Sequence, residues 1–177
     1  MTSPYQFEPT KSDFCDDYDS FNTNHNEFSQ CFGRSLLQIS NWCNCQKCTI
    51  LPTDRECICC SEIDILNKLR GIYKCVIENP SFSKLIMDEE VIDITRKQII
   101  SKTKNKGKKK LLCNTILENK TRRYLCYKQF VFWANEWTPI GKGNRVVIPA
   151  CVINVIRTKY AEEDGHYTGF KNSKIPY

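Results

Sequence analysis

Residues 42–75 read WCNCQKCTILPTDRECICCSEIDILNKLRGIYKC and contain seven of the 12 cysteines of the chain. Cys45 and Cys48 are separated by two residues, which is the short spacing with which two thiolates bind one tetrahedral zinc ion. The adjacent pair Cys59-Cys60 suits two metal ions better than one, because neighbouring side chains diverge. The stretch therefore predicts a sulfur-rich, dinuclear zinc site around which a single small domain is organised.

The composition is that of one folded domain with an unusual excess of cysteine. A chain of 177 residues, 41% of them hydrophobic, can form a hydrophobic core. Met1–Tyr5 has no basic start and no apolar run, and no apolar stretch reaches the roughly 18 residues of a membrane helix. We therefore expect an intracellular protein, cytoplasmic or nuclear, without membrane insertion. Thiols stay reduced in these compartments, so clustered cysteines indicate metal binding rather than disulfides.

Hydrophobic periodicity predicts a mainly α-helical fold with short extended segments. Helices are expected over 61–69, from Ser81 or Ser83 onward, over 87–101, over 111–137 with a break near Asn119, and over 149–160. Extended pieces are expected over 75–79 and 145–148.

The chain is expected to consist of one domain and two flanking segments. Residues 1–35 are polar and acidic and show no periodicity, so we expect them to be disordered. They contain Cys15 and Cys31, which we do not assign to a metal. The zinc-binding domain is expected over 36–171, followed by a short tail over 172–177.

Positive charge is concentrated in one part of the chain. The formal net charge is +6, yet twelve Lys/Arg and a single acid, Glu118, lie in 95–128. Six lysines form a run without apolar residues: Lys102, Lys104, Lys106, Lys108, Lys109 and Lys110. Their mutual repulsion, together with Gly107, predicts a flexible surface loop. The alternative is contact with nucleic acid, because lysines neutralise phosphates even from a flexible segment.

The pattern of histidines argues against a catalytic site. His25 and His166 lie outside the cysteine-rich stretch. A catalytic zinc ion usually has His or carboxylate ligands and an open position, whereas all-sulfur sites are closed and structural. We therefore expect no enzymatic activity. Cys113 and Cys126 fall on apolar helical stretches and are expected to be core thiols.

Several separate segments together resemble one family. They are Trp42-Cys43-x-Cys45-x-x-Cys48, Glu56-Cys57-x-Cys59-Cys60-x-Glu62, Cys75, Arg123-Tyr124-x-x-Tyr127 to Trp133, Ile148-Pro149-Ala150-Cys151, Ile156-Arg157, and Gly165-His166-Tyr167-Thr168-Gly169-Phe170-Lys171. In this order they resemble the intracellular C-terminal ballast domain of the ATP-gated purinergic receptor of subtype seven. The resemblance covers about residues 40–171 and includes neither the membrane spans nor the ATP-binding ectodomain, so channel activity is not expected.

The resemblance implies a helical domain with a two-zinc, cysteine-coordinated centre. The implied ligands are Cys45, Cys48, Cys59, Cys60, Cys75 and Cys151. Cys43 and Cys57 are further candidates as extra or substitute ligands. Because Cys151 is far along the chain, a metal ligand there would fasten the last helix to the cysteine segment.

The resemblance also implies a guanine-nucleotide pocket near the metal centre. Arg123, Tyr124 and Tyr127 stand at pocket positions, with tyrosine in place of histidine at 124. Ile153 and Glu162 stand where the receptor has basic residues, and a carboxylate would repel phosphate. The implied nucleotide binding is therefore degraded.

These observations predict a non-enzymatic, zinc-binding structural or interaction module with an unidentified protein partner. The alternative is a nucleic-acid-binding zinc protein that uses the basic region 95–128.

Overall fold

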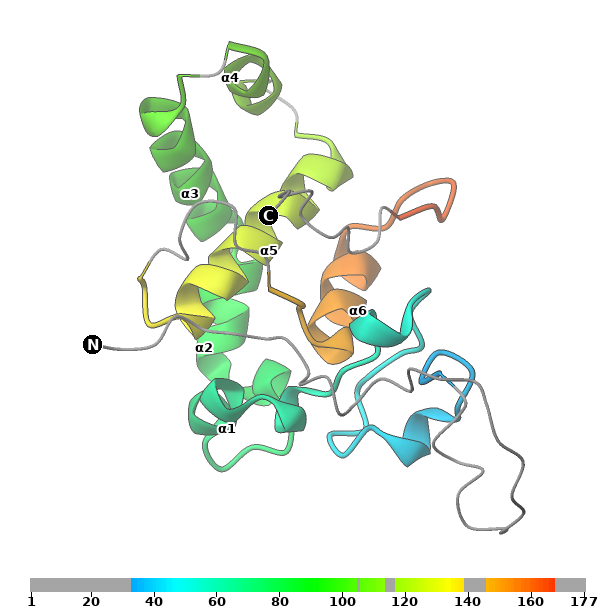
Figure 1. The fold of residues 1–177 in the computed structure, drawn as a ribbon. Coiled ribbons are helices and arrows are strands. Elements are labelled where there is room, and N and C mark those ends of the chain that lie inside the picture. Colours follow the sequence, from blue (N-terminus) through cyan, green and yellow to red (C-terminus); the bar gives the residue numbers. More distant parts are fainter. Residues whose placement is uncertain (1–32, 105, 114–116, 139–145, 168–177) are drawn as a thin grey trace, which may run out of the picture.

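Helices form all of the regular secondary structure in the described part of the chain. The structure is a computed structural model and describes residues 33–104, 106–113, 117–138 and 146–167 (Figure 1). The α-helices of these residues are α1 Asp64–Arg70, α2 Pro80–Phe82, α3 Glu89–Lys102, α4 Lys106–Cys113, α5 Asn119–Ala134 and α6 Ala150–Lys159. Short 3-10 turns are η2 Ile39–Asn41, η3 Asp54–Glu56, η4 Cys60–Glu62 and η5 Val76–Glu78, and a π-helical turn, η6 Ser83–Met87, follows α2.

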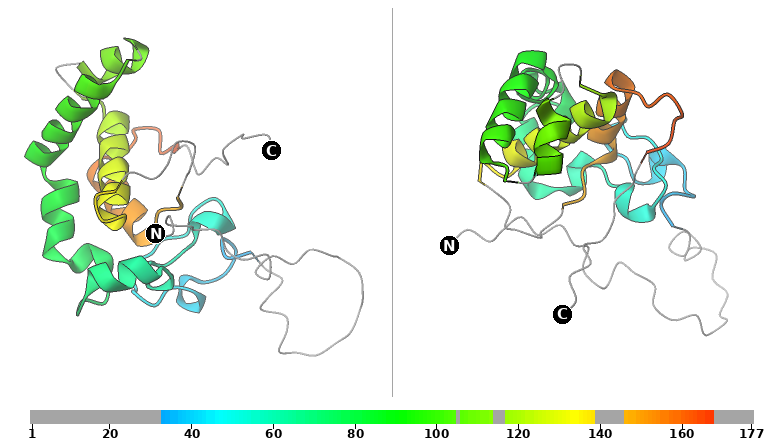
Figure 2. Two further views of the ribbon diagram at one scale, coloured as in Figure 1. Left: turned by 60° about the vertical axis from the view of Figure 1, so that its left-hand side comes forward. Right: turned by 90° about the horizontal axis from the view of Figure 1, so that it is seen from above.

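Helix α5 lies at the centre of the helical part. It runs between α3 and α6 in both Figure 1 and Figure 2, and it packs against α1, α3, α6 and η6. Its buried face meets Phe82 of α2, so that the rings of Phe82, Phe130 and Trp133 lie 6.2–6.4 Å apart. Aromatic rings at this separation stabilise each other beyond their burial. Leu125, Phe130 and Trp133 of this helix are buried in the core, whereas Phe132 is 36% exposed.

Most of the expected helices are confirmed, and their boundaries have clear causes. The helix predicted over 87–101 is α3, and the Asp88 carboxylate caps it by accepting hydrogen bonds from two backbone N–H groups of its first turn, at 3.0 and 3.1 Å. The predicted break near Asn119 is present, since α5 begins there. The last predicted helix is α6, which begins directly after Pro149.

Several local predictions are wrong. The helix expected to begin at Ser61 begins three residues later, because the Ser61 hydroxyl donates to the Cys59 sulfur, at 3.2 Å, within the η4 turn. Asn79, rather than Ser81 or Ser83, caps α2, with its side-chain oxygen 2.9 Å from the backbone nitrogen of Ser81. The extended piece predicted over 75–79 is the η5 turn. Residues 146–148 are irregular instead of forming a strand, and residue 145 lies outside the described residues.

The lysine run is helical from Lys106 onward, which corrects the predicted flexible loop. Leu112 is only 1% exposed, and its carbonyl oxygen accepts a hydrogen bond from Arg96 of α3 at 3.3 Å. These two contacts hold α4 against α3. The lysine run by itself predicted a loop because Leu112, the residue whose burial holds the helix, lies after the run. The adjacent Cys113 is exposed, so its prediction as a core thiol is wrong. Cys126 is confirmed as a core thiol, and burial raises its pKa to about 12.

No helix in the described residues is both long enough and apolar enough to cross a lipid bilayer.

The central position of α5 predicts different costs for two neighbouring phenylalanines. Phe130 is 2% exposed, so Phe130→Ala should lower the free energy of unfolding by about 3–5 kcal/mol. Phe132 is 36% exposed and its ring contacts that of Trp137, so Phe132→Ala should cost about 0.5–1.5 kcal/mol. Urea unfolding of both variants measures the difference, and equal losses would contradict the assigned core.

Candidate metal centre

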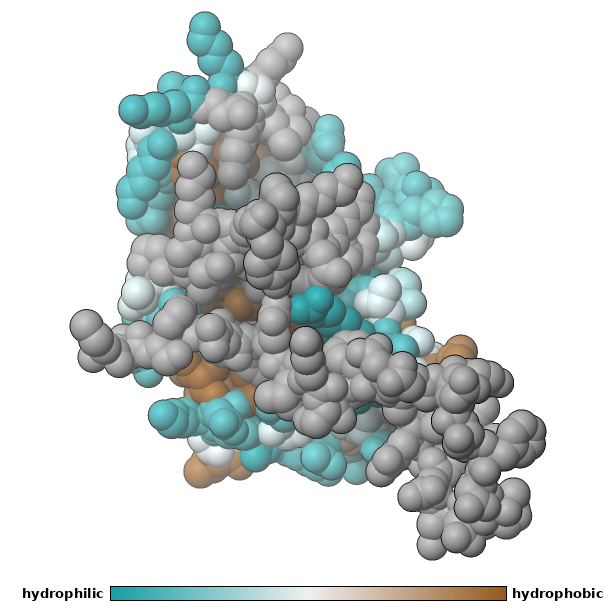
Figure 3. Space-filling model, in the orientation of Figure 1, coloured by the Kyte–Doolittle hydropathy of each residue, from teal (hydrophilic) through white to brown (hydrophobic). Residues whose placement is uncertain are grey.

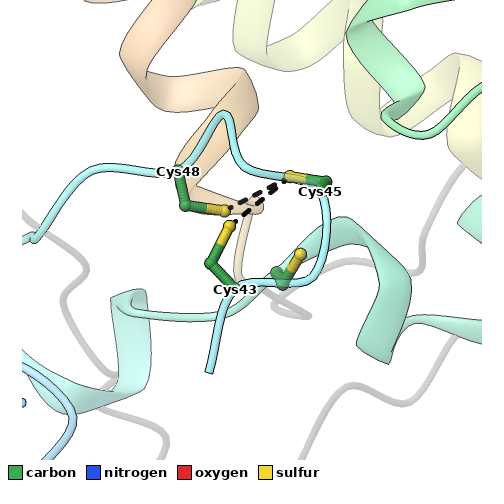
Figure 4. Close-up of side chains that lie close together, drawn as sticks. Cys43, Cys45 and Cys48 are labelled. Carbon is green, nitrogen blue, oxygen red and sulfur yellow. Dashed lines mark hydrogen bonds between the residues drawn. The ribbon is translucent and has the colours of Figure 1, made fainter. Parts of the chain in front are cut away.

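Four segments of the chain bring buried cysteines to one place. The loop after η2 contributes Cys43, Cys45 and Cys48, the start of η4 contributes Cys59 and Cys60, the residue before η5 is Cys75, and the first turn of α6 contributes Cys151. None of these side chains is more than 9% exposed. Figure 4 shows how the loop folds back so that its three sulfur atoms point toward one another.

The sulfur atoms form two groups of four that share one member. The groups are Cys43, Cys45, Cys48 and Cys59, and Cys45, Cys60, Cys75 and Cys151, with all sulfurs of a group within 4.8 Å of one another. The pairs Cys43–Cys45, Cys45–Cys48 and Cys60–Cys75 are each separated by 3.7 Å. Two thiolates bound to one tetrahedral zinc ion at about 2.3 Å lie about 3.8 Å apart. A disulfide requires about 2.05 Å, so the spacing fits a shared metal ion and not a covalent bond.

Cys45 is the member common to both groups. Its pKa is lowered, and the contact from the Cys151 thiol is the largest cause. A thiol whose neighbours donate to its sulfur is stabilised in the thiolate form, which is the form that binds metals. A sulfur shared between two ions allows seven cysteines to fill the eight positions of two four-coordinate sites.

Local backbone features hold the cysteines in place. Gln46 has a φ of 62°, and this left-handed residue turns the chain between Cys45 and Cys48. The same device then occurs twice: a glutamate three residues after a cysteine accepts a hydrogen bond from that cysteine's backbone nitrogen. The distances are 2.9 Å for Cys59 and 3.2 Å for Cys75. These bonds fix the η4 turn, which carries cysteines of both groups, and the η5 turn directly after Cys75.

Helix α6 is joined to the cysteine segment by its own backbone as well. The backbone nitrogen of Ala150 donates to the carbonyl oxygen of Ile58 at 2.9 Å. This bond puts Cys151, the next residue, against the cysteines of the η4 turn. The positive end of the helix dipole then lies where thiolate charge would gather, and the dipole would stabilise that charge.

The structure brings together all six cysteines implied by the family resemblance. It separates the two further candidates. Cys43 belongs to the first group, whereas Cys57 belongs to neither and its sulfur lies 3.3 and 3.5 Å from the backbone nitrogen and oxygen of Leu51. Burial raises the pKa of Cys57, which keeps it a neutral thiol. Sequence reasoning missed that Cys45 is shared, because the eight candidate cysteines fill two four-coordinate sites without sharing until Cys57 is excluded.

Arg123, one of the residues predicted to bind nucleotide, is the centre of a second cluster. This side chain is 6% exposed, donates to the carbonyl oxygen of Tyr160 at 2.6 Å and forms an ion pair with Glu162. The ring of Tyr167 lies 5.0 Å from the guanidinium carbon of Arg123 and 4.4 Å from that of Arg157. The C-terminal turn of the described chain thus supplies a carboxylate and an aromatic ring to Arg123.

The two tyrosines predicted beside Arg123 have different surroundings. Tyr127 is one helical turn from Arg123, is half-buried, and has its pKa raised by burial. Tyr124 is 38% exposed and lies on a different side of α5. The structure therefore brings Tyr127 to the face that carries Arg123, and leaves Tyr124 apart.

Fold and site together define a small helical domain built on a buried, all-cysteine cluster. Residues 7–171 match the family described as P2X purinoreceptor 7 intracellular domain, and the chain belongs to that family. The match confirms the resemblance and begins earlier in the chain than the motifs had indicated. A family defined by the intracellular part of a receptor also supports the predicted intracellular location. No curated protein and no solved structure matched the chain.

Proposed function

We propose that this chain is a non-enzymatic, zinc-stabilised interaction module of the cytoplasm. The observation that supports it best is the pair of cysteine groups that meet at Cys45. The donor set fits zinc, because groups of four soft thiolates suit the tetrahedral coordination of this ion. Cys43, Cys45, Cys48 and Cys59 would hold one ion, and Cys45, Cys60, Cys75 and Cys151 the other.

The zinc ions would act on folding rather than on a substrate. Each group supplies four sulfurs, so neither ion has an open position for water or substrate. Thiolates that come from residues 43 to 151 gather only in the folded chain, so the free energy of metal binding becomes free energy of folding. Seven thiolates with two zinc ions carry a charge of −3 (−7 + 4), and the dipole of α6 offsets part of it.

The proposed interaction role is supported by the family. The matching family is the intracellular domain of a receptor, and a rigid, metal-held module is suited to docking with another protein. A rigid surface loses little conformational entropy on binding, so a domain without catalytic residues can still bind a partner selectively. The identity of that partner is a matter for pull-down from the source cells.

The contacts around Arg123 support a structural role for this residue and argue against the binding of a guanine nucleotide there. A phosphate group would have to displace Glu162 from Arg123, and a base that stacked on Arg123 or Arg157 would have to displace Tyr167. The carboxylate already neutralises Arg123 in a site with little solvent, where such pairs are hard to replace. In this proposal Arg123 fastens the C-terminal turn to α5.

Cysteine substitutions test the proposed ligand set. Cys57→Ser should keep two zinc ions per chain, because Cys57 bonds only to backbone. Cys43→Ser should weaken one ion and retain the other, whereas Cys45→Ser should weaken both. Native mass spectrometry counts the ions, and thermal unfolding should fall in the same order. Equal zinc loss in the Cys57 and Cys45 variants would refute the assignment.

Calorimetric titration with GDP and GTP tests the role of the Arg123 cluster. The zinc-loaded chain should give no saturable heat, which corresponds to a dissociation constant weaker than about 1 mM. Arg123→Gln should in contrast lower thermal stability, because Glu162 then loses its partner. Saturable GDP binding that Arg123→Gln abolishes and Lys128→Gln leaves intact would restore the nucleotide-binding hypothesis.

A further inference from the structure

The outer end of α3 and α4 carries a dense positive surface, which we call the basic tip. It is formed by the exposed side chains of Lys102, Lys104, Lys106 and Lys109. Lys108 and Lys110 belong to the same lysine run of the sequence. Figure 3 shows hydrophilic residues at this end of the molecule, and Figure 1 shows α4 at the opposite end of the fold from α1.

The sequence next to the basic tip contains no acid that could neutralise it. No Asp or Glu occurs between Asp93 and Glu118. Asp93, the nearest acid before the tip, already pairs with Arg96 and Lys97. In the described part of the chain, no ion pair includes the four exposed lysines of the tip. Because a surface of one charge sign attracts the opposite sign, the basic tip favours the approach of an anionic partner.

Helix α4 concentrates this charge and holds it in place. Lysines occupy its first turn, where the helix dipole is already positive, and no acid offsets them there. A lone segment with this sequence would be a poor helix, but burial of Leu112 and the bond from Arg96 fix α4 on α3. The positive surface is thus presented by an ordered element and not by a loose loop.

We propose that the basic tip binds the phosphate backbone of double-stranded nucleic acid without reading its sequence. A projecting helix of about 10–12 Å diameter matches the roughly 12 Å width of a major groove. Lysines act as point charges toward phosphate, whereas sequence readout needs side chains directed at base edges. Residues 95–113 contain no aromatic residue for base stacking. Among those of them whose side chains are described, none is a large exposed hydrophobic residue that could insert into a membrane.

Two triple variants with the same net charge test the proposal. Lys104→Gln, Lys106→Gln and Lys109→Gln together change the tip, and Lys68→Gln, Lys74→Gln and Lys84→Gln together change exposed lysines elsewhere. Each set lowers the formal charge from +6 to +3 (+6 − 3). Fluorescence anisotropy with the zinc-loaded full chain and a duplex of about 20 base pairs is measured across a salt series. Replacement of the same three tip lysines by arginine serves as the charge-conserving variant.

The expected result is a difference in how steeply the affinity for the duplex falls with salt concentration. Four phosphate contacts, one for each exposed lysine of the tip, give a slope of about −3.6 in log affinity against log salt, or about a 150-fold loss between 50 and 200 mM. The tip variant should have a slope shallower by about 2.7, while the control and arginine variants stay near the wild-type slope and a duplex of scrambled sequence binds equally well. Equal loss in both glutamine variants, absence of duplex binding at low salt, or tighter binding to single strands would overturn the proposal. Tip-dependent binding to phosphatidylserine vesicles without duplex binding would overturn it in favour of a membrane.

Discussion

The contact between cysteine sulfurs is the interaction on which the rest of this structure depends. Residues 33–63 contain no α-helix, and their regular structure consists of the single turns η2, η3 and η4. Such a segment has few internal backbone hydrogen bonds with which to offset the entropy of ordering. The cysteines of this segment are buried against Cys75 and Cys151, so the order of this half is tied to the sulfur cluster. The helical half has an aromatic core of its own around α5.

Helix α6 connects the cysteine-rich half of the structure to the helical half, because its first turn contacts the cysteine cluster and its last turn contacts α3. At its start, Cys151 lies in the second cysteine group and Ala150 bonds to Ile58. At its end, the Tyr160 hydroxyl donates to the Glu89 carboxylate of α3 at 2.7 Å, and Lys159 donates to the carbonyl oxygen of Met87. A single helix thus spans the distance from the cysteine cluster to α3. The C-terminal turn adds a third attachment through Arg123.

Much of this architecture was predictable, and the failures share a physical cause. The cysteine spacing and the family motifs identified six residues that do lie together, since ligand spacing is a local property. The sharing of Cys45 depends on where four distant segments meet, which spacing alone does not determine. Likewise, lysine content predicted a loop at 102–110, but the buried Leu112 and the bond from Arg96 impose a helix. Tertiary contacts prevailed over local propensity there. Tertiary contacts also determine the Arg123 cluster, to which the C-terminal turn contributes Glu162 and Tyr167.

X-ray absorption at the zinc edge, on the full chain purified without added metal or chelator, tests the central claim most directly. Two zinc ions per chain should each show a shell of four sulfurs at about 2.3 Å, with no light-atom ligand. A well-folded chain without metal, or a shell dominated by nitrogen and oxygen, would contradict the account.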